Sequence, residues 1–172
     1  HALGHLDPAK LRVIVPGPQA DRGAMLVVNV GTGFNAAPVH ETPWGRMVAA
    51  SECGHVNMPV RSEADLRLAR FVETAHGFPG VEDVLSGRGL ERLYAFVTAE
   101  AGVPGEMRAA DIMAAIDRGD DPLAAETGRL FVRLLGSDAG NLALIHLPFG
   151  GVYLVGGVAR AFAAHLGPMG FA

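Results

Sequence analysis

The chain has 172 residues, of which 49% are hydrophobic and 19% charged, and its formal net charge is -4 at pH 7. This length favours one domain, or two small ones, and the hydrophobic content excludes a disordered chain. The acidic balance argues against nucleic-acid binding, which needs a basic surface. The single cysteine, Cys53, excludes an intramolecular disulfide and any zinc site with two or more cysteine ligands.

The sequence also lacks the signals of a membrane or secreted protein. Its richest apolar stretch is interrupted by His146, Pro148 and several glycines, whereas a membrane span needs about 20 apolar residues. The chain starts at His1, with neither a methionine nor the basic and then apolar layout of a signal peptide. These features leave open whether the protein is processed or is a piece of a longer one.

The first third of the chain predicts three successive antiparallel strands. The β-branched run 25–30 ends at the turn Gly31-Thr32-Gly33, which is typical of a buried strand entering a glycine turn. Residues 36–41 and 46–50 alternate weakly around a Pro-Trp-Gly sequence, and this pattern indicates a hairpin.

The remainder is mainly helical. Ser62 is expected to cap a helix that ends near Gly77, because Asp65 three residues later completes a capping-box pattern. Apolar spacing predicts further helices at about 89–101, at about 109–117, and from about 122 to 144 or 145.

A strand at 151–155, a Gly156-Gly157 turn and a helix at about 159–166 come last. A single strand behind a long helix needs neighbours in a sheet, and the opening strands supply them. The sequence therefore predicts an α/β fold with a mixed sheet that opens with an antiparallel β-meander and is packed by helices.

Two glycine turns follow predicted strands, at Gly31-Thr32-Gly33 and at Gly156-Gly157. Backbone amides in such turns can bind anionic oxygens, because glycine permits close approach, and Thr32 adds a hydroxyl donor. Neither turn fits the Walker A or dinucleotide-binding pattern. For either turn alone, ordinary turn chemistry is the better interpretation.

Two polar segments are candidates for binding a polyol. Glu52 and His55 stand three residues apart in a glycine-containing loop, where a carboxylate and an imidazole can converge on vicinal hydroxyls. A solvated polar loop explains them equally well. Glu82 precedes a glycine-bracketed helix start and could reach the same ligand, or could serve as a helix-capping residue.

Metal binding and thiol chemistry are not expected. Glu52, His55 and His40 form the only plausible ligand cluster in the sequence, and the H-E-x-x-H spacing is absent. Nothing near Cys53 marks it as a reactive thiol, so a small buried apolar role is its default.

Taken in order, five blocks of the sequence form a specific combination. They are Val30-Gly31-Thr32-Gly33-Phe34, Glu52-Cys53-Gly54-His55, the stretch 82–94 with its Leu-Ser-Gly, Gly140-Asn141-Leu142-Ala143-Leu144, and 149–158. The series resembles the C-terminal lobe of bacterial glucokinases, ATP-dependent hexose kinases of the actin/sugar-kinase/Hsp70 superfamily. The similarity covers essentially the whole chain and implies a ribonuclease-H-like, actin-like lobe.

The resemblance also implies roles for particular residues. Those that match its sugar-binding motifs are Glu52, His55 and Glu82. Those that match its turn for the ATP phosphates are Gly31, Thr32 and Gly33, and those that match its adenosine turn are Gly156 and Gly157. The long helix containing Asn141 would pack behind the nucleotide.

The chain departs from the family pattern at two positions. Cys53 stands where the family usually has glycine, and Asn35 stands at the end of a turn that usually reads Gly-Thr-Gly-Leu-Gly. Asparagine is the least costly non-glycine residue for a positive φ, so the turn is expected to survive.

Two motifs that such a kinase needs do not occur in the chain: an Asp-x-Gly-Gly-Thr phosphate turn, and a catalytic aspartate after an asparagine. Residues 1–12, expected to hold a helix end and a connection, resemble the stretch directly after that aspartate. We therefore expect residues 1–23 to connect from a missing N-terminal lobe and residues 24–172 to form an incomplete C-terminal lobe. The general base would lie upstream of His1, with no catalytic residue in this chain.

For the whole enzyme, the resemblance implies phosphorylation of glucose at O6 by Mg-ATP, the first step of glycolysis, with Mg²⁺ held mainly by the ATP phosphates. Enzymes of the family it resembles are commonly dimers, which leaves a homodimer open for this protein. We further expect a cytoplasmic protein with no nucleic-acid or membrane partner, and an isolated chain that is inactive. One alternative is a ROK-type sugar kinase, whose cysteine-rich zinc loop a single cysteine cannot build. Another is a non-catalytic sugar-binding or degenerate kinase lobe, whose signature would be loss of Glu52, His55 and Glu82.

Overall fold

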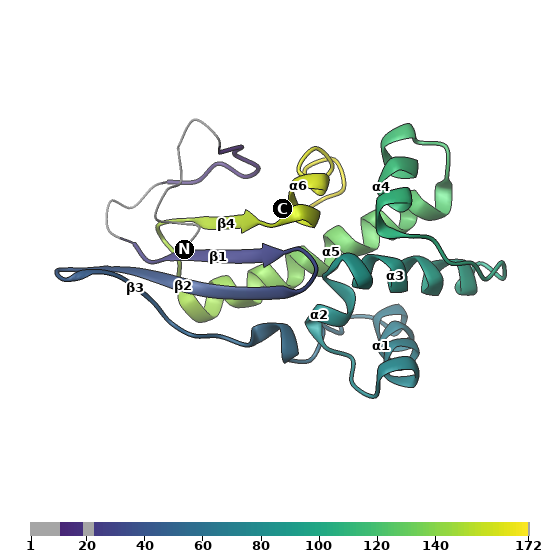
Figure 1. The fold of residues 1–172 in the computed structure, drawn as a ribbon, viewed down its shortest axis with the longest axis horizontal. Coiled ribbons are helices and arrows are strands. Elements are labelled where there is room, and N and C mark those ends of the chain that lie inside the picture. The colour runs from purple at the N-terminus through teal and green to yellow at the C-terminus, as the bar shows by residue number, and fades with distance from the viewer. Residues whose placement is uncertain (1–10, 19–22, 172) are drawn as a thin grey trace.

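The computed structural model describes residues 11–18 and 23–171. Its sheet consists of β1 (Met25–Val30), β2 (Phe34–Thr42), β3 (Gly45–Val48) and β4 (Val152–Val155), in the order β3-β2-β1-β4. The first three strands form an antiparallel meander, and β4 pairs in parallel with β1. In Figure 1 the arrowheads of β1 and β4 point the same way, toward α2 and α6. The predicted mixed sheet is confirmed.

The helical segments that the structure describes follow the predicted order. They are η3 (Cys53–His55), α1 (Glu63–His76), α2 (Val81–Val84), α3 (Gly87–Glu100), α4 (Ala109–Arg118), α5 (Pro122–His146) and α6 (Gly157–Phe162). The short helix α2 was not predicted, and α6 begins and ends earlier than the expected 159–166. Most of residues 1–12, where a helix end was expected, lie outside the described residues. No described helix is long and apolar enough to cross a membrane.

Side-chain caps explain where three of these helices begin. Ser62 Oγ accepts a hydrogen bond from the Asp65 amide at 3.2 Å, and Ser86 Oγ accepts one from the Gly89 amide at 3.0 Å. Asp121 Oδ1 accepts from the first two free amides of α5, at 2.8 and 3.0 Å. Each cap satisfies amides that have no partner inside the helix.

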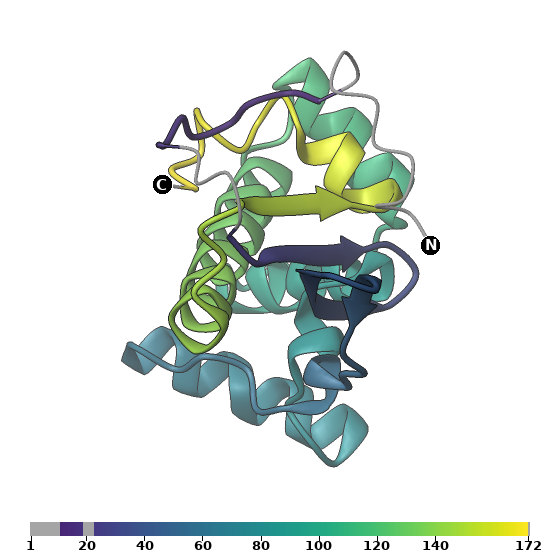
Figure 2. The same ribbon diagram turned by 90° about the vertical axis from the view of Figure 1, so that its left-hand side faces the viewer.

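The core lies between one face of the sheet and the helices. Leu26, Val28 and Val30 alternate along β1 and are fully buried, as expected for a strand with one face in the core. Helix α5 packs against β1, α3 and α4, and Figure 2 shows it passing beside the sheet. The rings of Phe131 and Phe162 stack with centroids 4.6 Å apart and join α5 to α6.

A buried ion pair joins the start of α1 to α5. Asp65, which is 1% exposed, accepts hydrogen bonds from the Arg133 guanidinium and from the Arg61 amide. Burial alone would raise the pKa of Asp65, but these hydrogen bonds outweigh it and hold the pKa below its usual 3.8. Asp65 thus does not close the predicted capping box with the Ser62 amide, because its carboxylate accepts from the Arg61 amide and the Arg133 guanidinium instead.

A second aspartate in the core has no such partner. Asp138 lies on the buried side of α5 with 5% of its surface exposed, and its Oδ2 has no hydrogen-bond partner among the described residues. Burial raises the pKa of Asp138 to about 6. Its ionised form is therefore destabilising in the folded protein.

We expect Asp138→Asn to remove a pH dependence of stability. In the wild type the pKa of Asp138 rises from 3.8 to about 6 on folding, so the contribution of Asp138 to stability is most favourable at low pH and falls between these two values, by about 3 kcal/mol in all. Urea unfolding at about pH 4.5 and pH 7 measures this difference. When the pH is raised from 4.5 to 7, the free energy of unfolding of Asp138→Asn should increase by roughly 2 kcal/mol relative to that of the wild type. Asp111→Asn, on the exposed side of α4, serves as the control. Parallel pH profiles for wild type and Asp138→Asn would contradict this account.

Candidate functional site

Three segments that are distant in sequence meet at the carboxyl end of β1. Glu82, on α2, accepts a hydrogen bond through Oε2 from the Phe34 amide at 2.8 Å. A Cβ on Gly33 would lie only 2.6 Å from the same oxygen, so glycine is what lets the carboxylate approach the turn. Oε1 of Glu82 accepts no hydrogen bond from the described residues.

The Glu52–His55 loop packs against the same turn through Gly54. A Cβ on Gly54 would lie 2.2 Å from the Phe34 carbonyl oxygen and 3.5 Å from Cβ of Glu82. The residues after this loop pair with the segment before α2, since the Met58 amide donates to the Pro79 carbonyl and the Val81 amide to the Val56 carbonyl, both at 2.9 Å. The loop and Glu82 are thereby held together.

Glu52 and His55 both extend into solvent from the short helix η3. Their side chains are 82% and 73% exposed, and Glu52 Oε2 lies 3.9 Å from His55 Nε2. Neither has another side-chain partner among the described residues. The pair is free to contact a ligand, in the same loop whose Gly54 touches Glu82.

The Gly31-Thr32-Gly33 turn is fixed by hydrogen bonds at both ends. The Gly31 amide donates to the Gly33 carbonyl at 2.9 Å, and the Gly31 carbonyl accepts from the Gly87 amide at the start of α3 at 2.8 Å. The amides of Thr32 and Gly33 have no partner among the described residues, and Thr32 is exposed. These two amides and the Thr32 hydroxyl are donors that an anionic oxygen can use.

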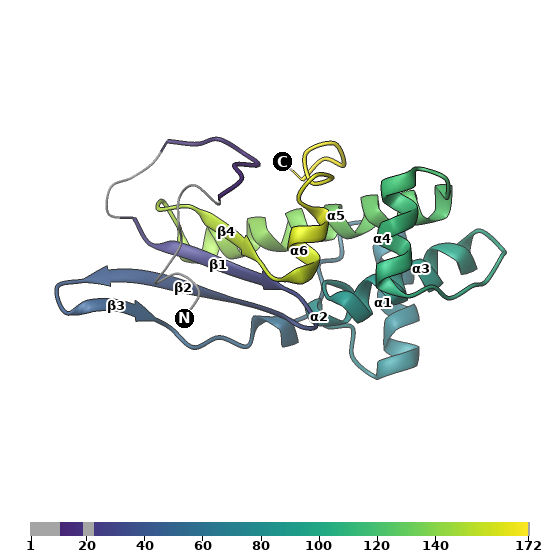
Figure 3. The ribbon, with the colours of Figure 1, turned by 45° about the horizontal axis from the view of Figure 1, so that its top comes forward.

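The second glycine turn lies directly beside the first. Gly156 has φ 103°, which favours glycine, and a Cβ on it would lie 2.3 Å from the Val30 carbonyl oxygen. The amide nitrogen of Gly157 lies 3.9 Å from the place a Cβ on Gly31 would take. Parallel pairing of β1 with β4 therefore brings the two turns to one edge of the sheet, as Figure 3 shows.

The two departures from the family pattern are accommodated in different ways. Asn35 does not have a positive φ: it lies in β2 opposite Asn29, and its Nδ2 donates to the Ser51 carbonyl at 2.6 Å. The turn therefore does not need the positive φ that asparagine tolerates, because the strand begins one residue before Asn35. Cys53 is half-buried against β2, with its Sγ 3.1 Å from the Ala36 amide nitrogen.

The sequence did not reveal two features of the site. One is the Phe34 amide as the partner of Glu82, because a backbone donor leaves no mark on the sequence. The other is Asn29, an exposed polar residue in an otherwise apolar strand. Its position between apolar neighbours was a signal that could have been used.

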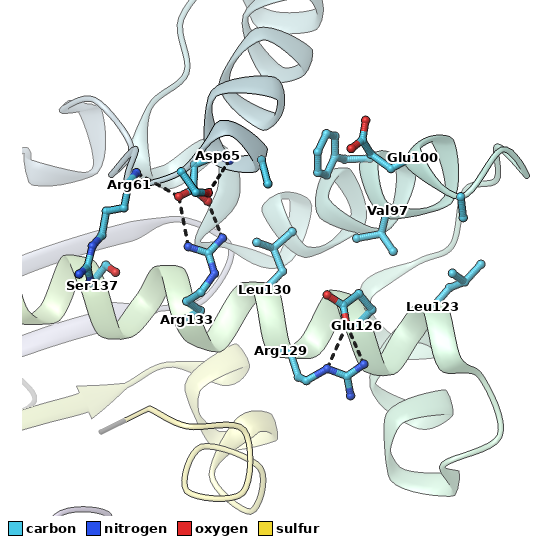
Figure 4. Close-up of a pocket in the computed structure, with 14 residues that line it drawn as sticks. Arg61, Asp65, Val97, Glu100, Leu123, Glu126, Arg129, Leu130, Arg133 and Ser137 are labelled. Atoms are coloured by element: carbon cyan, nitrogen blue, oxygen red, sulfur yellow. Dashed lines mark hydrogen bonds and ion pairs between the residues drawn. The ribbon is translucent and has the colours of Figure 1, made fainter.

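A groove of about 720 Å³ lies elsewhere, between α1, α3 and α5, and is shown in Figure 4. Its charged side chains mostly pair with one another: Arg133 with Asp65, and Arg129 with Glu126 at 2.7 Å. It shares no lining residue with the glycine turns. Within residues 11–18 and 23–171, no group of three or more His, Cys, Asp or Glu side chains is placed to hold a metal ion.

The family model described as Glucokinase matches residues 1–172. The chain belongs to the glucokinase family. Among its relatives, the glucokinases of Sinorhizobium fredii and Saccharophagus degradans are each 35% identical to it, over 145 and 162 residues. These alignments cover 84% and 94% of this chain but 43% and 50% of those proteins, so it spans half or less of their length.

Solved structures of glucokinases have the same fold. One from an Antarctic psychrotroph superposes with a TM-score of 0.89 at 30% identity, over 99% of this chain and 53% of that one. Balamuthia mandrillaris glucokinase in complex with glucose gives a TM-score of 0.73 at 25% identity, over 86% and 44% of the two chains. A ROK family glucokinase from Streptomyces griseus, in complex with glucose and AMPPNP, gives 0.57 at 18% identity over 83% and 47%, a likeness of fold alone. The family match and the better superpositions decide against the ROK alternative.

We expect Gly54→Ala to destabilise this glucokinase-family lobe, because the new methyl group would lie 2.2 Å from the Phe34 carbonyl oxygen. Relieving that overlap separates the loop from the turn and should cost about 2 kcal/mol or more in the free energy of unfolding. Gly140→Ala is the matched control, because Gly140 is at an exposed position of α5 and nothing lies within 4 Å of its added methyl group. The control should stabilise by up to about 1 kcal/mol. Equal unfolding midpoints for the two variants would show that the contact at Gly54 is unimportant.

Proposed function

We propose that the complete protein phosphorylates glucose at O6 with ATP as the donor, and that this chain supplies the sugar-orienting residues and part of the nucleotide site. The hydrogen bond from the Phe34 amide to Glu82 carries the proposal. It joins a carboxylate of the expected sugar site to the residue that directly follows the expected phosphate turn. In a phosphoryl transfer, the site that binds the attacking hydroxyl group has to lie next to the site that binds the phosphate of the nucleotide.

Glu82, Glu52 and His55 are the sugar-binding residues in this proposal. Glu82 uses Oε2 within the protein, which leaves Oε1 to accept a hydrogen bond from a sugar hydroxyl. Glu52 and His55 are exposed and, within residues 11–18 and 23–171, pair only with each other, so each can bind a hydroxyl without losing a contact in the core. Carboxylates are strong acceptors for hydroxyl groups, which favours a polyol over an apolar ligand.

The two glycine turns are the nucleotide-binding part. The Thr32 and Gly33 amides, which have no partner in the described part of the chain, fit phosphate oxygens, and the backbone at Gly156 approaches β1 too closely for any side chain. These donors suit a polyanion without needing a basic surface. Mg²⁺, held mainly by the ATP phosphates, would neutralise charge on the transferred group.

Proton abstraction from the sugar is assigned to a part of the protein other than this chain. The Asp-x-Gly-Gly-Thr turn and the Asn-Asp pair do not occur in the sequence. The proposal therefore keeps residues 1–23 as a connection from an N-terminal lobe and residues 24–172 as the C-terminal lobe. By resemblance we also propose a cytoplasmic homodimer.

A coupled assay for glucose 6-phosphate tests the proposal. The complete protein with glucose and Mg-ATP should form this product, whereas the 172-residue chain alone should form none above a Glu82→Gln control. Activity of the isolated chain would overturn the assignment of the base to another part of the protein. Glucose binding by the complete protein without turnover would instead indicate a non-catalytic sugar-binding lobe.

Glu52→Gln in the complete protein tests the sugar role separately. Loss of a charge-assisted hydrogen bond should raise KM for glucose roughly tenfold or more while KM for ATP changes little. Glu73→Gln, on the exposed side of α1, is the matched control. Equal increases in both KM values would count against a sugar-specific role for Glu52.

A further inference from the structure

Asn29 is an exposed polar residue on a strand that otherwise carries apolar side chains. Its neighbours Val28 and Val30 are fully buried, whereas Asn29 lies on the opposite face of β1. No hydrogen bond to its carboxamide comes from residues 11–18 or 23–171. A carboxamide that only supported the turn would be expected to bond to the backbone there.

The carboxamide lies between the two glycine turns. Its Oδ1 is 2.9 Å from the place a Cβ on Gly156 would take and 4.0 Å from the corresponding place on Gly31. The Gly157 amide nitrogen lies 3.9 Å from that same place on Gly31. Asn29 pairs with Val155 in the parallel register, so strand geometry fixes it at this junction.

The chemistry of this junction suits an anionic group. The Thr32 and Gly33 amides on one side have no partner among the described residues. The Asn29 carboxamide, whose Oδ1 lies on the Gly156 side, adds two N–H donors on its Nδ2 without any charge. A carboxylate in place of Asn29 would repel an anion at the same distance. A substitution of Asn29 is therefore expected to change the affinity for a phosphate group much more than the affinity for a neutral ribose or base.

We propose that the side chain of Asn29 donates a hydrogen bond to a phosphate group of the bound nucleotide, at the junction of the two glycine turns. The inference rests on the proposed function, because it assumes that a nucleotide occupies these turns. Asn29 then fixes the position at which the phosphate groups of the nucleotide pass from the Gly156-Gly157 turn to the Gly31-Thr32-Gly33 turn. It is a binding residue that the sugar and glycine motifs do not include.

Calorimetric titration of the complete protein with Mg²⁺-free ADP and, separately, with adenosine tests this role. Asn29→Asp keeps the shape of the side chain and adds one negative charge. It should weaken ADP binding at least about tenfold, with a smaller loss at high salt. Asn29→Ala should weaken ADP binding by a few-fold, and both variants should bind adenosine as the wild type does. Thr74→Asp is the control: it adds the same charge at an exposed position of α1 and should bind ADP as the wild type does.

The other possible results of these titrations contradict either the role of Asn29 or the nucleotide site itself. If the wild type binds ADP and Asn29→Asp binds it equally well, the inference about Asn29 fails and the proposed function stands. Equal losses for ADP and adenosine would show that Asn29 acts on the shape of the turns rather than on a phosphate. Failure of the wild type to bind ADP would overturn the nucleotide site and the inference with it. Melting curves check folding, and if Asn29→Asp does not fold, the ADP and adenosine affinities of Asn29→Ala decide the question.

Discussion

The backbone of Phe34 is the constraint on which the candidate site depends. Its amide donates to Glu82, and its carbonyl oxygen lies where a side chain on Gly54 would have to be. One peptide position thus joins the strand meander, the exposed Glu52–His55 loop and the start of the helical region. Because both contacts use main-chain atoms, they depend on the chain path and on glycine at two positions rather than on complementary side chains.

The two buried aspartates show how the same residue type can have opposite effects in one fold. Asp65 has an arginine and a backbone amide as partners, so its charge stabilises the contact between α1 and α5. Asp138 lies as deeply but has an oxygen without a partner, so its charge is a cost that the rest of the core has to offset. Partners, rather than burial itself, decide the sign of the contribution.

Much of the fold could be predicted from the sequence, because the long helices have clear periodicity and the strands are marked by β-branched residues and glycine turns. Ser62, Gly77 and the β-branched run of β1 are local features, and the structure confirms the helix limits and the strand that they indicate. The short α2 has too few residues for a periodic pattern, and the conformation of Asn35 depends on pairing with β1. Glu82 could be singled out as a candidate, but its backbone partner could not, because that contact arises only when the two segments fold together.

The parallel pairing of β1 with β4 joins residue 26 to residue 152, about three quarters of the chain apart. Closing so long a loop is entropically costly and slow compared with the local meander and its adjoining loop. The sugar-side contacts lie within residues 33–87, whereas the two glycine turns come together only when the last strand docks. The two halves of the site therefore differ in what they need to form. The side that holds Glu52 and Glu82 depends on contacts within one stretch of the chain, whereas the junction of the glycine turns exists only while β4 is paired with β1.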